Sequence, residues 1–239
     1  MPDPTRVLLP RRRAPLSAAL VLGLTVLLVL PFCDRLVGSA GAHPGELDEY
    51  GGHFDERTGS YHYHRPKADM ARRKREFLTW NAGQESGELR GTVVRVDRPD
   101  AVWLHIPYRP AYQDMARILS PSNRNDEQQW VLFWLAHVSP EGSAAFGKEY
   151  NAWFYKKVIY ELDSKLRGQE TTAQFRVLSA AGRIKGMLLR EDENINLWMV
   201  LNGWSYYVLT GAPNPYHEQF VEAEAKARQN KAGLWERAQ

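Results

Sequence analysis

Cysteine is almost absent from this sequence, since Cys33 is the only one among 239 residues. A single cysteine excludes a disulfide framework within the chain and a zinc site built from several thiolates. A strong excess of one charge is also lacking, because 31 Lys and Arg stand against 28 Asp and Glu. The 44% hydrophobic and 25% charged residues are typical of a globular protein and exclude a mainly disordered or collagen-like chain.

The small positive charge lies in the first 42 residues, which hold five Arg and two Asp. Residues 43–239 are neutral, with 26 basic and 26 acidic residues, and residues 88–239 hold 19 basic and 18 acidic residues. This balance does not support a strongly basic nucleic-acid-binding surface, although nucleic acid stays a partner to consider.

The one long hydrophobic run, Leu16–Phe32, follows the basic cluster Arg11–Arg13 and precedes the small residues Ala40-Gly41-Ala42. This order is typical of a signal peptide with an A-x-A cleavage site. The run is also shorter than the roughly 20 residues of a spanning helix. We therefore predict a signal peptide over residues 1–42 and an exported protein, periplasmic or secreted. The alternative is an uncleaved leader, which would be the only membrane anchor.

Four of the seven histidines lie within residues 43–64: His43, His53, His62 and His64. His62 and His64 would share one side of a strand, and the turn signal Thr58-Gly59-Ser60 can fold that strand back toward His53. Neutral imidazoles that converge in this way can bind Zn²⁺ or Cu²⁺. Asp48 or Asp55 could add a carboxylate. The alternative is a hairpin whose histidines only form hydrogen bonds.

The pattern G-x-H…R-T-G-x-Y-H-x-H in this segment resembles the YHYH-type module of exported bacterial proteins. Members usually carry cysteines where this chain has Gly52 and Tyr63, so the resemblance implies no thiolate site here. We assign residues 43–66 to this module. Residues 67–87 follow as a short helix and a linker that ends in Gly83–Gly87.

The remaining chain predicts an α+β fold in which strands precede most helices, with a five-stranded Greek-key barrel as the natural candidate. Residues Tyr108–Gln129 are polar and are predicted to form a long loop. About three helices are expected: Ala145–Tyr160, Ile195–Leu201, and one that starts at Asn214-Pro215 and ends at Gly233. Expected strands are Leu89–Arg95, Ala101–Ile106, Trp130–Val138, Thr171–Leu178, Arg183–Leu189 and Trp204–Val208.

The C-terminal segment E-A-E-A-K-A-R-Q-N-K-A-G-L-W resembles the closing helix of the staphylococcal-nuclease-like (thermonuclease) family, which typically ends A-x-x-x-K-x-G-L-W. The resemblance covers residues 88–236 and implies an OB-type barrel with three helices. Other matching segments are Gly91–Asp97, Pro140-Glu141, Phe146–Glu149, Gly182-Arg183, Asn196–Val200 and Gly203-Trp204.

Members of this family cleave phosphodiesters with a bound Ca²⁺, two aspartates, two arginines and a glutamate. The resemblance assigns the first aspartate to Asp100, the glutamate to Glu141 and the second arginine to Arg183. The first arginine is replaced by Phe133 and the second aspartate by Val138. Ca²⁺ binding in the barrel is therefore in doubt, since valine offers no oxygen.

His137 precedes Val138 and could rescue the chemistry as a base or a metal ligand. Strand alternation would place the two side chains on opposite faces, which favours His137 as an ordinary barrel residue. Trp103, Trp130 and Trp134 alternate along their strands, so some of them could face the groove.

Three hypotheses follow. The first is an exported nuclease-fold protein with a degraded site that binds nucleic acid or another ligand with weak or no cleavage. The second is an active, divalent-metal-dependent nuclease that uses Asp100, Glu141 and Arg183. The third is an envelope metal-binding protein that uses the histidine-rich segment.

Overall fold

The computed structural model describes residues 52–55, 60–64, 67–141, 146–209 and 214–237. The chain divides after His43 into two units, and the second unit contains all of these residues. The predicted leader, Cys33 and His43 lie outside the described residues. No helix in the described ranges is long and apolar enough to cross a membrane.

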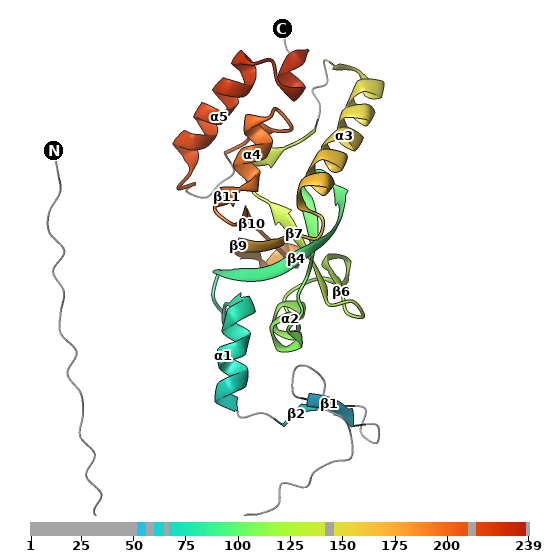
Figure 1. Ribbon diagram of the computed structural model, residues 1–239, viewed down its shortest axis with the longest axis vertical. Coiled ribbons are helices and arrows are strands. Elements are labelled where there is room, and N and C mark those ends of the chain that lie inside the picture. The colour runs from blue at the N-terminus through green and yellow to red at the C-terminus, as the bar shows by residue number, and fades with distance from the viewer. Residues whose placement is uncertain (1–51, 56–59, 65–66, 142–145, 210–213, 238–239) are drawn as a thin grey trace, which may run out of the picture. The chain divides into compact units, whose positions relative to one another are not determined.

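Helices are interspersed between groups of strands along the chain (Figure 1). The helices are α1 (Lys67–Phe77), α2 (Arg109–Ala116), η1 (Pro121–Asn123), α3 (Lys148–Leu166), η3 (Ser179–Ala181), α4 (Ile195–Leu201), α5 (His217–Gln229) and η4 (Gly233–Glu236). The strands are β1 (Gly52–Asp55), β2 (Ser60–Tyr63), β3 (Leu78–Thr79), β4 (Ser86–Arg98), β5 (Ala101–His105), β6 (Arg124–Asn125), β7 (Trp130–Leu135), β8 (Val138–Ser139), β9 (Glu170–Leu178), β10 (Arg183–Arg190), β11 (Glu193–Asn194) and β12 (Tyr206–Tyr207).

Five strands form a closed barrel in the order β10-β9-β4-β5-β7. Parallel pairing of β10 with β7, in which Ile184 lies opposite Phe133, closes the barrel. Strands β10 and β9 approach closely at Gly186, where an added Cβ would meet the Gln174 carbonyl oxygen of β9. The α+β barrel predicted from the sequence is thus confirmed.

Apolar side chains fill the barrel, and in β4 and β9 they come from alternate positions. In β4, Leu89, Val93 and Val96 are buried, and in β9 Ala173 and Phe175 are buried. The intervening residues are more exposed, as expected for strands with one face on the core.

Helices α3, α4 and α5 lie on one side of the barrel, and α1 and α2 lie on the other (Figure 1). The fully buried Asn196 joins α4 to the barrel. Its Nδ2 donates to the carbonyl oxygens of Ala136 (2.8 Å) and Gly186 (3.0 Å), and its Oδ1 accepts from the Leu188 amide (2.9 Å).

The prediction of a long loop over Tyr108–Gln129 is wrong. This segment contains α2, η1 and β6, and the Tyr112 and Met115 side chains of α2 are buried. Pro110 stands in the first turn of α2, where a missing amide costs nothing. The segment is polar because only one side of a short helix contacts the core.

The prediction of one strand over Trp130–Val138 is also wrong. Strand β7 ends at Leu135, and His137 adopts a left-handed conformation with φ 60°. The chain then turns into β8, which pairs with β12 (Tyr206↔Ser139) rather than with the barrel.

Residues 67–87, expected to be a short helix and a linker, form α1, β3 and the start of β4. Leu78 and Trp80 are buried in the core, and β3 pairs with β4 through Leu78↔Leu89. Apolar burial therefore extends into the segment before residue 88.

Strands β1 and β2 form the predicted N-terminal hairpin, with His53 opposite His62 in backbone register. The turn signal at Thr58-Gly59 lies outside the described residues.

Candidate functional site

A small cleft of about 140 Å³ contains two of the predicted site residues, Asp100 and Glu141. Asp100 follows Pro99 in the turn between β4 and β5, and Glu141 follows β8. Arg98, Val138 and Tyr155 also line the cleft. We call this hollow the carboxylate cleft.

Asp100 already has a cationic partner in the carboxylate cleft. Its Oδ1 lies 3.2 Å from Nε of Arg98, and both side chains are partly exposed. Asp97, the other acid of this turn, instead pairs with Arg95 (2.6 Å) and accepts a hydrogen bond from Trp103 Nε1 (3.2 Å). Asp100 is therefore the only one of these two aspartates that faces the cleft.

Phe133 and Val138, the positions at which the family resemblance predicts substitutions, lie in different surroundings. Phe133 is fully buried among the core residues of the barrel. Val138 lines the carboxylate cleft beside Asp100 and Glu141. The Val138 side chain offers no oxygen to the cleft, and Phe133 is part of the hydrophobic core.

Trp134 connects Arg183 to the carboxylate cleft. The guanidinium carbon of Arg98 lies 4.5 Å from the centroid of the Trp134 ring, and that of Arg183 lies 4.9 Å from it. Trp134 also donates from Nε1 to Oδ1 of the buried Asn123 (3.1 Å), and Asn123 Nδ2 donates to the Gly182 carbonyl (3.0 Å). Asn123 of η1 therefore fixes Trp134 beside Arg183.

A larger cleft of about 760 Å³, which we call the basic cleft, contains Arg183, Lys185 and Arg176. Burial lowers the pKa of Lys185 and nearby Arg183 lowers it further, whereas Asp100 raises it. Lys185 thus lies within electrostatic reach of both Arg183 and Asp100. Among the described residues, no carboxylate forms an ion pair with Lys185, and Nε of Arg183 is buried without a hydrogen-bond partner.

His137 lines the basic cleft rather than the carboxylate cleft. Its Nδ1 lies 3.2 Å from the Val208 carbonyl oxygen, and its ring packs against Tyr207 and Phe220. Burial lowers the pKa of His137, and Lys185 lowers it further, while the contact with Val208 opposes both effects. His137 is therefore a buried turn residue and not an ordinary strand residue of the barrel.

Comparison with known families now adds to this geometry. Residues 116–237 match the family described as Staphylococcal nuclease homologue. This chain belongs to that family. No curated protein matches the chain. The match begins at the end of α2, and the structure adds β4 and β5 as the first two strands of the same staphylococcal nuclease-like barrel.

The oxygen donors of the carboxylate cleft do not fit a tight Ca²⁺ site. Ca²⁺ takes six to eight oxygens, and two acidic side chains line the cleft, one of which is paired with Arg98. In the described part of the chain, no group of three His, Cys, Asp or Glu residues is arranged to hold a metal ion. We therefore derive no catalytic step through a metal.

The predicted histidine site is described in part. Nε2 of His53 lies 3.1 Å from Nε2 of His64, which follows β2. His62 occupies β2 opposite His53 in the backbone register, and Asp55 ends β1. Asp48 and His43 lie outside the described residues.

Arg98, Lys185 and Asn123 are site residues that were not predicted from the sequence, whereas Trp134 was expected only as one of three tryptophans that could face the groove. Lys185 could have been found, because a residue two positions after Arg183 on a strand faces the same side. Arg98 and Asn123 could not, because their roles depend on strand register and on the conformation of the segment between β5 and β7.

Proposed function

We propose that this staphylococcal nuclease-like protein binds a phosphodiester chain and cleaves it weakly or not at all. The main support is the grouping of Arg98, Arg183 and Lys185 around Trp134, next to a cleft in which Val138 stands where the family has its second aspartate. Arginine and lysine recognise phosphate oxygens through charge-assisted hydrogen bonds. The site thus has cationic side chains that can bind phosphate, but it has fewer acidic side chains than a metal ion needs.

Binding is tested with the purified chain and a labelled 20-nucleotide single strand in the presence of chelator. Arg183→Ala should weaken the affinity about 10- to 150-fold, because charge-assisted hydrogen bonds contribute roughly 1.5–3 kcal/mol each. Arg167→Ala is the matched control, since Arg167 is the C-cap residue of α3 and pairs with Asp163. Equal affinity of both variants and the wild type would overturn the proposal.

A second proposal is that the histidine hairpin binds a divalent metal ion, Zn²⁺ or Cu²⁺. The supporting observation is the 3.1 Å separation of the His53 and His64 Nε2 atoms. Two nitrogens that bind a tetrahedral ion at about 2.0–2.1 Å lie about 3.3 Å apart. A direct N–H···N hydrogen bond has a similar length, so metal binding must be measured.

Titration calorimetry with Zn²⁺ or Cu²⁺ alone makes this measurement. We expect one equivalent to bind the wild type and to be lost in the His53/His62/His64→Ala variant. His217→Ala is the control, because His217 contacts Tyr207 in another part of the chain. Equal metal binding by all three proteins would contradict the proposal.

Export also remains a proposal, supported by the apolar run Leu16–Phe32 and the small residues before His43. Mass spectrometry of the native protein tests it: an N-terminus at His43 would support cleavage, and an intact leader would support an anchor.

A further inference from the structure

A polar cleft of about 470 Å³ is lined by α2 and by the segment that leads from β6 into β7. Its walls include three arginines, Arg109, Arg117 and Arg124, and one acidic residue, Asp126. We call this hollow the arginine cleft. None of its lining residues lines the carboxylate cleft or the basic cleft, so it is a separate site.

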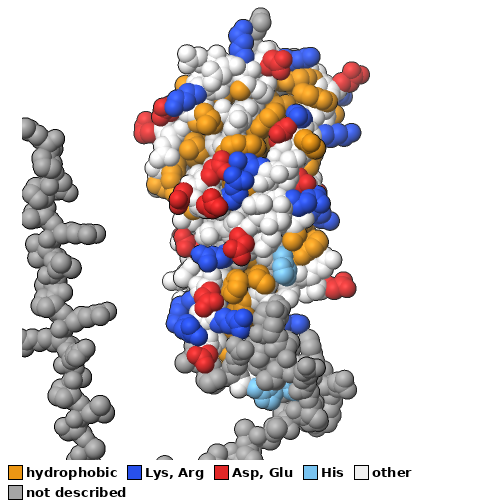
Figure 2. Space-filling view, viewed as in Figure 1, with side chains coloured by type: hydrophobic (Ala, Val, Ile, Leu, Met, Phe, Trp, Pro, Cys, Tyr) orange, Lys and Arg blue, Asp and Glu red, His pale blue; other side chains and the backbone are white. Residues whose placement is uncertain are grey.

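The arginine cleft carries an excess of positive charge, because three arginines and one aspartate line it. Arg117 pairs with Asp114 (3.2 Å), but Asp114 also pairs with Lys74 (2.7 Å), so this network leaves the excess of two charges unchanged. The nearly neutral composition of residues 88–239 does not reveal this local excess. The face of the molecule in Figure 2 likewise has acidic and basic side chains intermixed.

Arg124 is held in a fixed orientation at this cleft. Its Nη1 donates to the carbonyl oxygens of Ala116 and Leu119, the second at 3.0 Å, and its Nε lies 3.2 Å from Oδ1 of Asp126. Among the described residues, none accepts a hydrogen bond from its Nη2. A guanidinium that is already held in place loses little freedom when it binds a carboxylate.

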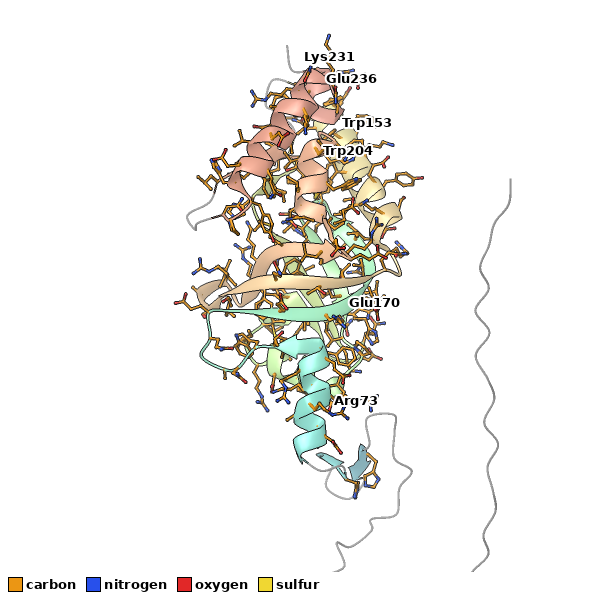
Figure 3. All side chains as sticks on the ribbon, turned by 60° about the vertical axis from the view of Figure 1, so that its left-hand side comes forward. Arg73, Trp153, Glu170, Trp204, Lys231 and Glu236 are labelled. Carbon is orange, nitrogen blue, oxygen red and sulfur yellow. The ribbon has the colours of Figure 1, made fainter. Side chains whose placement is uncertain are left out.

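Helix α2, which forms one wall of the arginine cleft, is fixed by contacts with α1. The hydroxyl of Tyr108, at the N-cap of α2, donates to the Met70 carbonyl oxygen (3.2 Å). The guanidinium carbon of Arg73, labelled on α1 in Figure 3, lies 5.9 Å from the centroid of the Tyr108 ring. The ion pair between Lys74 and Asp114 adds a third contact. The wall is thus held from outside the cleft, and the site is pre-formed.

The arginine cleft also contains a buried hydrogen-bond acceptor. Oε1 of Gln129 is buried and accepts no hydrogen bond from any described residue. Its main chain is fixed, because the Gln129 carbonyl oxygen accepts from the Ile106 amide (3.0 Å). The nearby hydroxyl of Tyr112 donates to Asp126 instead (2.6 Å). A buried acceptor without a partner costs free energy, and a ligand that carries an O–H group removes that cost.

We propose that the arginine cleft binds a small organic dianion that carries a hydroxyl group, of the hydroxydicarboxylate class. Its two carboxylates would match the excess of two positive charges through charge-assisted hydrogen bonds with the arginines. Its hydroxyl group would donate to Oε1 of Gln129. The volume of the cleft lies in the range of small-molecule sites, which favours an organic ligand over a single tetrahedral anion.

The role of the ligand hydroxyl is tested with two probes that differ only in that group, L-malate and succinate. Both are dianions at neutral pH, where carboxyl groups are ionised. Titration calorimetry with the full chain measures each affinity. Malate should bind about 2- to 12-fold more tightly than succinate, because one added hydrogen bond has this net effect. Inorganic phosphate is the probe for a simple tetrahedral anion.

Two variants separate the acceptor from the cations. Gln129→Met keeps the length of the side chain and removes the amide, so malate should bind no more tightly than succinate, whose affinity should not change. Arg109→Gln should weaken the binding of both probes about 10- to 150-fold, through the loss of charge-assisted hydrogen bonds. Arg167→Gln is the matched control, since Arg167 pairs with Asp163 at the end of α3.

A second substitution at position 129 keeps the test decisive if Gln129→Met does not fold. Gln129 has φ 55°, and asparagine tolerates this left-handed conformation well. Gln129→Asn shortens the side chain by one methylene group, so it should also reduce the preference for malate over succinate. Circular dichroism and the melting temperature establish that each variant is folded.

The outcomes decide the proposal without involving phosphodiester binding. A preference for malate that disappears in the Gln129 variants supports the arginine cleft as a hydroxydicarboxylate site. Equal wild-type affinity for malate and succinate, no binding of either, or tighter binding of inorganic phosphate overturns it. Equal losses for both probes in the Gln129 variants also overturn it. Arg183→Ala, which tests the proposed function, should bind malate as the wild type does.

Discussion

Val138 is the residue at which we expect the carboxylate cleft to differ most clearly from the catalytic pattern of the family. Its side chain lines the cleft with Asp100 and Glu141, so an aspartate there would add a third carboxylate. Ca²⁺ affinity rises with the number of charged oxygen ligands. We expect Val138→Asp to increase Ca²⁺ affinity by about tenfold or more, measured by titration calorimetry with the ion alone.

The control for this substitution is Val138→Asn, which has a similar size and no charge. If Asn increases Ca²⁺ affinity as much as Asp, the missing carboxylate is not what limits binding. Position 133 offers no comparable test, because Phe133 is fully buried and an arginine there would place a charge in the core.

At the scale of elements, the buried Asn196 amide is the side chain that hydrogen-bonds α4 to the barrel, beside the apolar packing of Ile195 and Met199. Asn196→Ala removes three hydrogen bonds and leaves the Ala136 and Gly186 carbonyls and the Leu188 amide with fewer partners. We expect the free energy of unfolding to fall by about 2–3 kcal/mol, measured by urea denaturation. Asn202→Ala, at the end of α4, removes one bond to the Trp198 carbonyl and should cost less. Equal losses would contradict this role of Asn196.

The elements also indicate how far the sequence predicts the structure. The barrel strands and α3, α4 and α5 follow from clear apolar periodicity. Asp100 and Glu141 line one cleft because the turn after β4 and the segment after β8 lie next to each other. Helix α2 was not predicted, because the sequence of a short helix with one apolar side resembles that of a polar loop. The end of β7 was not predicted, because His137 takes a left-handed conformation that histidine adopts less readily than glycine.

At the scale of the whole molecule, a nearly neutral domain should bind nucleic acid with weak salt dependence. Each phosphate contacted on a single strand contributes about −0.7 to the slope of log K against log salt. Contacts from Arg95, Arg98, Arg183 and Lys185 therefore predict a slope of about −2 to −3, measured by fluorescence anisotropy. A slope steeper than about −5 would indicate a larger basic surface.

Stability should depend on pH through His137. The pKa of His137 in the folded protein lies below the ordinary 6.5. As the pH falls below 6.5, the unfolded chain therefore binds more protons than the folded protein does. The contribution of the neutral His137 side chain to the free energy of unfolding is complete above pH 6.5. It is lost as the pH falls toward the pKa that His137 has in the folded protein. His137→Asn, which tolerates the left-handed backbone, should lose less stability between pH 7.5 and 5 in urea denaturation. An unchanged pH dependence would contradict this assignment.

The rate of strand cleavage by the purified chain tests the central claim most directly. Single-stranded DNA and RNA are incubated with Ca²⁺, Mg²⁺, Mn²⁺ or Zn²⁺, or with chelator, and Glu141→Gln is measured in parallel. The account predicts that the strand is bound and that little or no cleavage depends on Glu141. Rapid metal-dependent cleavage that is lost in Glu141→Gln would contradict it and would establish a working nuclease built on Asp100, Glu141 and Arg183.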